Sequence, residues 1–288
     1  MTRNPFLPIL LVLSLVTLAC RFTVNLPVGE VNTGPTVTDE INVALPQDPD
    51  AVSDVELEFG AGNLNLSPGA QGALVAGTAT YNVPEFKPEV TVQGNQVRII
   101  QMEGKIERFP TLGPDVVNRW DLQFGPSPIR LAIKAGAYQG EVELGGLPLQ
   151  DLSVMDGAAK TRVSFSQPNP GEMDTLRYET GASQVTLTGL ANANFQDMVF
   201  QSGAGDYELD FSGQLQRDAS VEIRSGLSNL VIIVPRGTAA LVTIEGGLSN
   251  VNASGDWQAS GGEYILDGEG PTLTFRVDMG AGSVSLRN

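Results

Sequence analysis

The chain has 288 residues, with 17 basic against 33 acidic side chains, a formal net charge of −16, one cysteine and no histidine. The excess of acid argues against a protein that binds nucleic acid or an anionic bilayer surface through charge. The lone cysteine excludes an internal disulfide, and the lack of histidine excludes a Ser-His-Asp or Cys-His catalytic arrangement and an imidazole zinc site.

The first twenty residues have the pattern of a signal peptide. Arg3 supplies a positive charge, residues 6–18 form an apolar run, and Ala19 stands directly before Cys20. The run is shorter than the ~20 residues of a membrane-spanning helix. Residues 1–20 resemble a bacterial lipoprotein signal, which implies cleavage before Cys20 and lipidation of that residue. An ordinary cleaved signal, an uncleaved anchor and a buried structural cysteine are the alternatives.

Residues 21–51 carry four prolines and scattered Thr, Asn, Asp and Gly without sustained periodicity. Such a composition cannot bury enough apolar surface to offset its ordering entropy. We therefore expect a flexible tether that holds a folded part away from a membrane anchor.

Residues 52–125 predict an N-terminal β domain. Apolar and glutamate residues alternate over 55–59 and lead to Gly60, which opens a Gly-Ala-Gly bend. Two longer strands are predicted over residues 74–81 and 90–100, and an amphipathic strand over 120–124. With a boundary near Pro126, this segment either forms a separate core or caps and extends the stack that follows.

Residues 126–288 repeat one unit that ends at a glycine, at steps of 21, 24, 22, 23, 21 and 33 residues. The anchor glycines are Gly136, Gly157, Gly181, Gly203, Gly226, Gly247 and Gly280. Apolar residues stand five and three places before each anchor, and they resume four and six places after most of them. Period-two alternation at a fixed offset from a glycine predicts a strand, a bend and a second strand.

A repeat of about 22 residues favours one coil of a β-solenoid over a propeller blade of ~40 residues. We therefore predict an all-β, parallel β-helix-like stack with apolar columns inside. We assign Gly60 and the seven anchors to the corners, on the grounds that glycine tolerates positive φ. A Gly203→Val change should then destabilise the fold more than the same change in a loop.

The residues two places before the anchors should form a polar ladder on the outside of the stack. They are Lys134, Met155, Glu179, Gln201, Arg224, Glu245 and Asp278. Sequential stacking would place Arg224 between Gln201 and Glu245. Acids alternate with other residues in this row instead of clustering.

The last step of the repeat contains an excursion over residues 254–271, which is rich in glycine and carries Trp257 and Tyr264. As an insertion it could be a surface loop that binds a partner. We expect instead that the two aromatic side chains fold over the open end of the stack.

Several strings resemble known bacterial envelope proteins. Residues 55–62 and 77–88 are similar to the N-terminal toast-rack domain. The strings at 190–195, 209–213 and 279–284 resemble the C-terminal domain of LiaF-type, cell-wall-active antibiotic response proteins and related adhesin β-helices. The resemblance covers about residues 52–288 and implies a stacked β architecture and an envelope setting, and it brings no catalytic residues.

The chemistry-bearing patterns are weak. No G-x-x-x-x-G-K-[ST] string occurs, so a phosphate-binding loop is not expected. Asp206 stands where calcium-binding nonapeptide repeats place an acid, but the other coils lack it, so a solvated turn is favoured over a calcium site. We expect no catalytic residue, metal or cofactor.

The sequence thus predicts a non-catalytic, lipid-anchored extracytoplasmic protein that offers a binding, adhesion or scaffolding surface in the cell envelope, through an envelope protein or glycan partner. One alternative is an envelope-stress sensor that works through a membrane partner. Another is a carbohydrate-active enzyme on the same architecture, which would need paired carboxylates.

Overall fold

The structure is a computed structural model, and it describes residues 33–101 and 115–288. The predicted signal peptide, Cys20 and the first part of the predicted tether lie outside the described residues. Within those residues no helix is both long enough and apolar enough to cross a membrane.

Fifteen strands of the described part of the chain join in one sheet. In chain order they are β1 (Val37–Ala44), β2 (Ser53–Pro68), β3 (Ala73–Tyr81), β4 (Pro88–Gln93), β5 (Gln96–Gln101), β6 (Asn118–Phe124), β7 (Ile129–Glu143), β8 (Leu149–Ser164), β9 (Met173–Thr188), β10 (Phe195–Asp210), β11 (Ala219–Ile233), β12 (Gly237–Ala253), β13 (Gln258–Ser260), β14 (Glu263–Leu266) and β15 (Gly268–Arg287). Two short 3-10 turns, η2 (Pro84–Phe86) and η3 (Leu190–Ala193), lie between strands.

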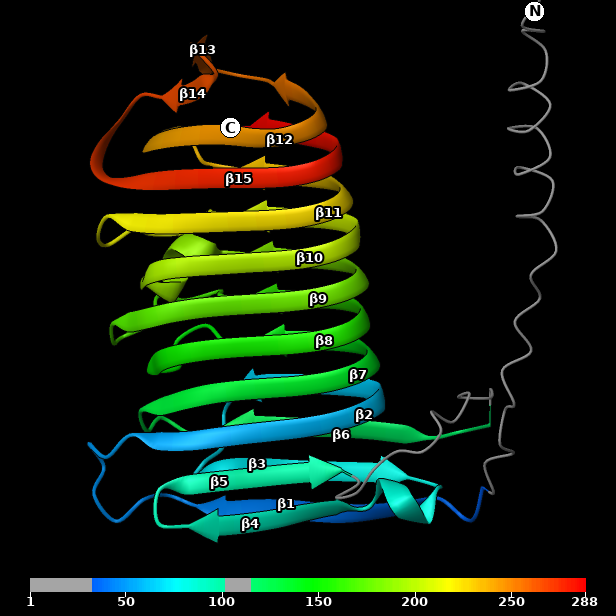
Figure 1. The fold of residues 1–288 in the computed structure, drawn as a ribbon. Helices are drawn as coiled ribbons and strands as arrows, with labels where there is room; N and C mark the ends of the chain where they lie inside the picture. The colour runs from blue at the N-terminus through cyan, green and yellow to red at the C-terminus, as the bar shows by residue number, and fades with distance from the viewer. Residues whose placement is uncertain (1–32, 102–114) are drawn as a thin grey trace, which may run out of the picture. The chain divides into compact units, whose positions relative to one another are not determined.

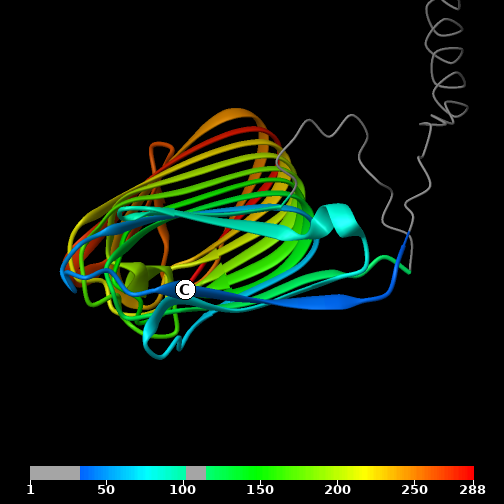
Figure 2. The same cartoon turned by 90° about the horizontal axis from the view of Figure 1, so that it is seen from below.

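The middle of the sheet is a run of long parallel strands in the order β2-β7-β8-β9-β10-β11-β15-β12. Figures 1 and 2 show that each of these strands bends near its middle, so that every strand has two arms. The all-β class and a long, largely parallel sheet are therefore confirmed.

The predicted apolar columns are confirmed residue by residue. Ile133 lies opposite Val154, Val154 opposite Tyr178, Tyr178 opposite Phe200, and Phe200 opposite Ile223. All five are at most 1% exposed. Stacked burial of this kind explains the repeat, because each strand needs its neighbour to remove its apolar face from water.

The anchor glycines lie mid-strand and in line with one another, but positive φ is the wrong explanation for them. None of the eight has a positive φ. A Cβ built on Gly181 would lie 2.3 Å from the carbonyl oxygen of Gly157, and one on Gly203 would lie 2.6 Å from that of Gly181. The same close approach, within 2.9 Å of a neighbouring carbonyl oxygen, selects glycine at Gly157, Gly226 and Gly280. Positive φ occurs two residues after an anchor only where that residue is also glycine, at Gly62, Gly205 and Gly282.

The predicted sequential order of the stack is wrong at its C-terminal end. β15 lies between β11 and β12, so Arg224 is opposite Asp278 and not Glu245. The excursion that precedes β15 forms the β13–β14 hairpin, and β14 pairs antiparallel with the outer edge of β12. Trp257 and Tyr264 are half-buried against the core, as expected for residues that cover an end.

The N-terminal end is covered by shorter strands. β5 pairs with the first arm of β2 and β6 with its second arm, and β4, β3 and β1 continue outward by antiparallel pairing. The strands predicted over residues 74–81 and 120–124 match β3 and β6. The single strand predicted over 90–100 is instead the β4–β5 hairpin, which turns at Gly94 with φ +59°.

Part of the predicted tether is structured. Residues 37–44 form β1, and Ile41 and Val43 are each 3% exposed. The alternation of Ile41 and Val43 with polar neighbours is a short strand pattern that the nearby prolines obscure. The predicted boundary near Pro126 stays a prediction, although β2 pairs with β7 across it and one apolar cluster contains residues from both sides.

Candidate functional site

The outer face of the first arm carries the predicted ladder. In the order of the sheet it reads Glu58, Lys134, Met155, Glu179, Gln201, Arg224, Asp278 and Glu245, each directly opposite the next. The regular spacing of this row comes from the register of the parallel strands and so needs no loop to position it.

An open groove of about 880 Å³ runs along this ladder beside the bend, across strands β8 to β15. We call it the bend groove and define its wall as Met155, Glu179, Gln201, Arg224 and Asp278, and its floor as Asp156, Thr180, Ser202 and Ser225. The floor residues stand immediately before the anchor glycines, one row closer to the bend than the ladder.

Hydrogen bonds tie the floor together. The Tyr178 hydroxyl donates to Asp156 Oδ2 at 2.8 Å, and the Thr180 hydroxyl donates to Asp156 Oδ1. Further along, the Ser202 hydroxyl donates to Ser225 Oγ at 2.8 Å. The floor therefore consists of two hydrogen-bonded clusters, one around Asp156 and one around Ser225, each of which joins neighbouring strands.

Asp156 is the most perturbed acid of the groove. Burial raises the pKa of its carboxyl above the ordinary value, while hydrogen bonds from Thr180, Tyr178 and Ser183 act in the opposite direction. Burial, with the charge of Asp156 as the next cause, also raises the pKa of Tyr138 to about 12. The phenol of Tyr138 thus stays neutral at neutral pH, and the carboxyl of Asp156 takes up a proton more readily than an exposed aspartate.

The wall combines paired and unpaired polar groups. Arg224 Nη2 lies 2.5 Å from Glu222 Oε1, and Arg177 Nη1 lies 2.9 Å from Glu179 Oε1. Within the described residues, the side chains of Gln201 and Asp278 make no hydrogen bond or ion pair, so they are free to bind a ligand. Met155 adds an apolar side chain that is 45% exposed.

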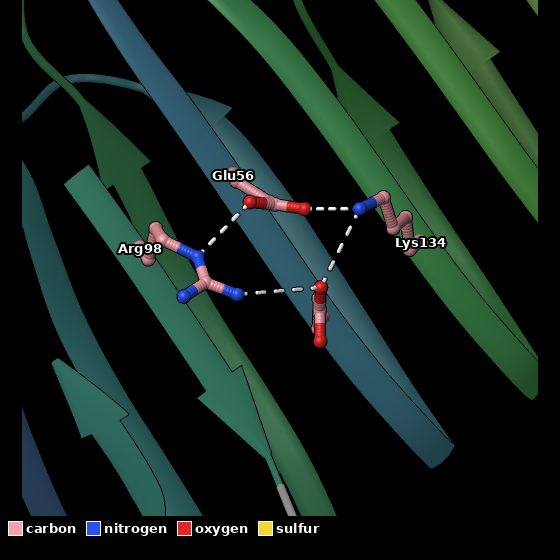
Figure 3. Close-up of polar contacts among 4 residues, drawn as sticks. Glu56, Arg98 and Lys134 are labelled. Atoms are coloured by element: carbon pink, nitrogen blue, oxygen red, sulfur yellow. Dashed lines mark hydrogen bonds and ion pairs between the residues drawn. The ribbon is translucent and has the colours of Figure 1, made fainter. Parts of the chain in front are cut away.

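A second polar region, the charge network, lies on β5, β2 and β7 and consists of Glu56, Glu58, Arg98 and Lys134. Figure 3 shows the side chains of Arg98 and Lys134 pointing toward Glu56. Arg98 Nε lies 3.1 Å from Glu56 Oε2, and Lys134 Nζ contacts both Glu56 and Glu58. The hydrogen bond from Lys134 lowers the pKa of Glu56, and the same bond raises the pKa of Lys134. Because each cation is already neutralised, this network fixes strand register more than it offers a binding site.

Three acids, Asp156, Glu179 and Asp278, line the groove. Asp156 was not among the predicted candidates because it belongs to the floor row. Asp278 was predicted in the ladder, but the insertion of β15 between β11 and β12 places it beside Arg224. The available signal was the polar residue directly before Gly157, Gly181, Gly203 and Gly226.

Within the described residues, the fold places no cluster of metal ligands around Asp206. Asp206 Oδ1 accepts a hydrogen bond from Asn229 on the neighbouring strand at 2.9 Å. The part of the chain that the structure describes contains no group of three or more Cys, Asp or Glu placed to hold a metal ion.

Solved structures of similar fold come from several bacteria. A "putative cell adhesion protein" from Clostridium sporogenes is 17% identical, with 88% of this chain and 99% of that chain covered at a TM-score of 0.48. A "putative adhesin" from Bacteroides fragilis is 15% identical, with 88% and 97% covered at a TM-score of 0.46. A "putative lipid binding protein" from Parabacteroides distasonis is 14% identical, with 88% and 97% covered at 0.39.

No curated protein matches the chain. The resemblance to LiaF-type proteins stays a prediction. One protein-family model matches residues 32–175, and its description is the N-terminal domain of toast_rack, DUF2154. That match spans half of the sequence and includes β1 to β8, and the chain therefore belongs to the toast-rack N-terminal domain family.

Proposed function

We propose that this protein is a non-catalytic binding surface of the bacterial cell envelope, built as a β-solenoid that presents rows of polar side chains. The observation that carries the proposal is the ladder, to which each strand adds one side chain in register, together with the bend groove beside it. Both lie over a single buried core. A rigid sheet of this kind holds its side chains at fixed spacing without any ordering step on binding.

The proposed setting is the outer face of the cytoplasmic membrane, with Cys20 lipidated and the segment before β1 acting as the link to the folded part. The signal-peptide pattern before Cys20 supports this placement. The net charge of −16 fits a body that is repelled by an anionic bilayer and is held near it by an anchor.

Fractionation of cells that express the wild-type protein and Cys20→Ser tests the anchor. We expect the wild type in the membrane fraction and Cys20→Ser in the soluble extracytoplasmic fraction. Retention of Cys20→Ser on membranes would overturn the lipid anchor. Pull-down from native membranes, beside a glycan array, then separates a glycan-binding role from a sensor that works through a membrane protein.

A glycoside hydrolase is a second candidate, and one observation favours it. The groove contains Asp156, an acid of raised pKa, and Glu179 on the adjacent strand. The carboxyl of Asp156 is, however, occupied by hydrogen bonds from Tyr178 and Thr180. Release of reducing ends from cell-wall polysaccharide, abolished by Asp156→Asn, would establish the enzyme, and we expect no release.

A further inference from the structure

We propose that the bend groove binds a linear, uncharged polysaccharide laid across the strands, with one sugar ring on each strand. The inference rests on the proposed function as a binding surface and adds the chemical class of the ligand.

The spacing of side chains along the ladder indicates which class of linear polymer can bind in step with it. Neighbouring strands lie ~4.8 Å apart, so the wall offers one side chain at that interval. An extended peptide places side chains on one face at about twice the ~3.3 Å rise per residue, and it would fall out of step with the ladder within two strands. A β-1,4-linked glycan advances by roughly one strand spacing per ring, so it stays in step along the whole groove.

The groups of the groove match sugar hydroxyls. Gln201 offers both an amide donor and an acceptor, Asp278 offers a carboxylate, and neither is used within the described residues. The hydroxyls of Thr180, Ser202 and Ser225 are already hydrogen bonded within the protein, so they brace the floor and leave ligand binding to the wall. Met155, exposed at one end, gives an apolar surface for the C–H face of a ring. Gln201 and Asp278 together supply a donor and several acceptors, which suit a ligand whose every ring carries hydroxyl groups.

Charge argues against an anionic polymer. The groove contains three carboxyl groups, on Asp156, Glu179 and Asp278, against the single cation of Arg224. Arg224 is paired with Glu222 and Glu179 with Arg177, which leaves Asp156 and Asp278 without a cation among the described residues. The whole chain carries a net charge of −16. A polymer of phosphates or uronic acids would be repelled, whereas a neutral glycan would not.

The test is a binding titration of the purified full-length protein in detergent with cello- and chito-oligosaccharides from disaccharide to octasaccharide. Since the wall spans β8, β9, β10, β11 and β15, we expect affinity to rise with each ring up to five rings and then to level off. Gln201→Ala and Asp278→Ala should each weaken binding about tenfold, because each removes hydrogen bonds to the ligand.

Gln184→Ala is the matched control, because Gln184 is an exposed glutamine on β9 outside the groove. It should leave affinity unchanged, and all three variants should keep the wild-type thermal unfolding. No binding of any oligosaccharide, equal affinity at every length, or tighter binding of polygalacturonate or oligolysine would overturn the inference. A protein that is anchored and captures an envelope protein but no glycan would contradict the groove assignment and leave the proposed function standing.

Discussion

The edges of the strands are covered in different ways in the middle of the sheet and at its two ends. In the middle, from β7 to β11, every strand is covered on both edges by a strand of nearly identical pattern. At the ends, short antiparallel strands do the covering: β4, β3 and β1 at one end, and the β13–β14 hairpin at the other. Repetition therefore specifies the interior of the stack, while irregular segments protect the edges that repetition would leave open.

The difference has an energetic consequence. A residue in the middle is packed by neighbours on both sides, so its loss is expected to leave a cavity that cannot collapse. A residue at an end faces a short strand or a hairpin that can shift.

Truncation of a core side chain should show the largest difference in stability loss between the middle of the sheet and its ends. Phe200 is fully buried, stacked on Tyr178 at 5.7 Å and edge-to-face with Tyr207 at 5.3 Å. Phe200→Ala should lower the free energy of unfolding by about 3–5 kcal/mol. Tyr264→Ala, at the half-buried cover of the C-terminal end, should lose clearly less. Chemical denaturation measures both, and equal losses would contradict the distinction.

Addition of one methyl group at the bend should show the same contrast. A Cβ at Gly203 meets the Gly181 carbonyl oxygen at 2.6 Å, whereas a Cβ at Gly60 first meets the side-chain oxygen of Gln101 at 3.4 Å, which is an ordinary van der Waals distance. Gly203→Ala should destabilise by about 1–3 kcal/mol through overpacking. Gly60→Ala should be neutral or slightly stabilising, because alanine restricts the unfolded chain. Similar losses at both positions would show that backbone approach is not what selects glycine.

The raised pKa of Asp156, in the floor of the bend groove, predicts that the stability of the fold depends on pH. Because burial raises the pKa of Asp156 above its ordinary value of 3.8, the folded protein holds this proton more tightly than the unfolded chain. The wild type should thus lose stability relative to Asp156→Asn as the pH rises from 3.8 through the raised pKa. Asp156→Ala should lose about 1–3 kcal/mol, since Thr180 and Tyr178 lose their acceptor.

Urea unfolding of the wild type and Asp156→Asn at several pH values measures that difference. A stability difference between them that stays constant with pH would mean that Asp156 is not perturbed in the folded state.

The charge network should contribute least to the free energy of unfolding. Lys134→Met should change the free energy of unfolding by at most about 1 kcal/mol, because the four side chains are substantially exposed. The lowered pKa of Glu56 means that its contribution is present at neutral pH and is lost as the pH falls below 4.5 through the folded pKa. The raised pKa of Lys134 means that its contribution is lost as the pH rises above 10.5. Denaturation in low and high salt checks this prediction, and an effect insensitive to salt would contradict it.

The sequence predicted the regular part of this fold well because a period of about 22 residues with fixed offsets leaves little choice of register. The columns through Ile133, Tyr178 and Phe200 follow from that pattern alone. The order of the last two strands could not be predicted, since β12 and β15 carry the same pattern and either could follow β11. Only the path of the chain through the β13–β14 hairpin decides between them.

The candidate site was predictable in part. The ladder from Glu179 to Arg224 was identified from its offset to the glycines, and the structure places it as expected. The groove was not predicted, because its floor comes from a second row and one wall residue, Asp278, comes from the displaced strand. The residues that line a groove depend on which strands are neighbours in the sheet, and the periodicity of the sequence does not specify those neighbours.

The order of the strands is the claim on which both the ladder and the groove depend, and cysteine cross-linking tests it most directly. In a Cys20→Ser background, Arg224→Cys with Asp278→Cys should form a disulfide on mild oxidation, because directly opposite residues on adjacent strands lie within the roughly 4.4–6.8 Å range of Cα separations that disulfides allow. Arg224→Cys with Glu245→Cys should stay reduced, since β15 separates the two strands. A disulfide between positions 224 and 245, with none between 224 and 278, would contradict the account.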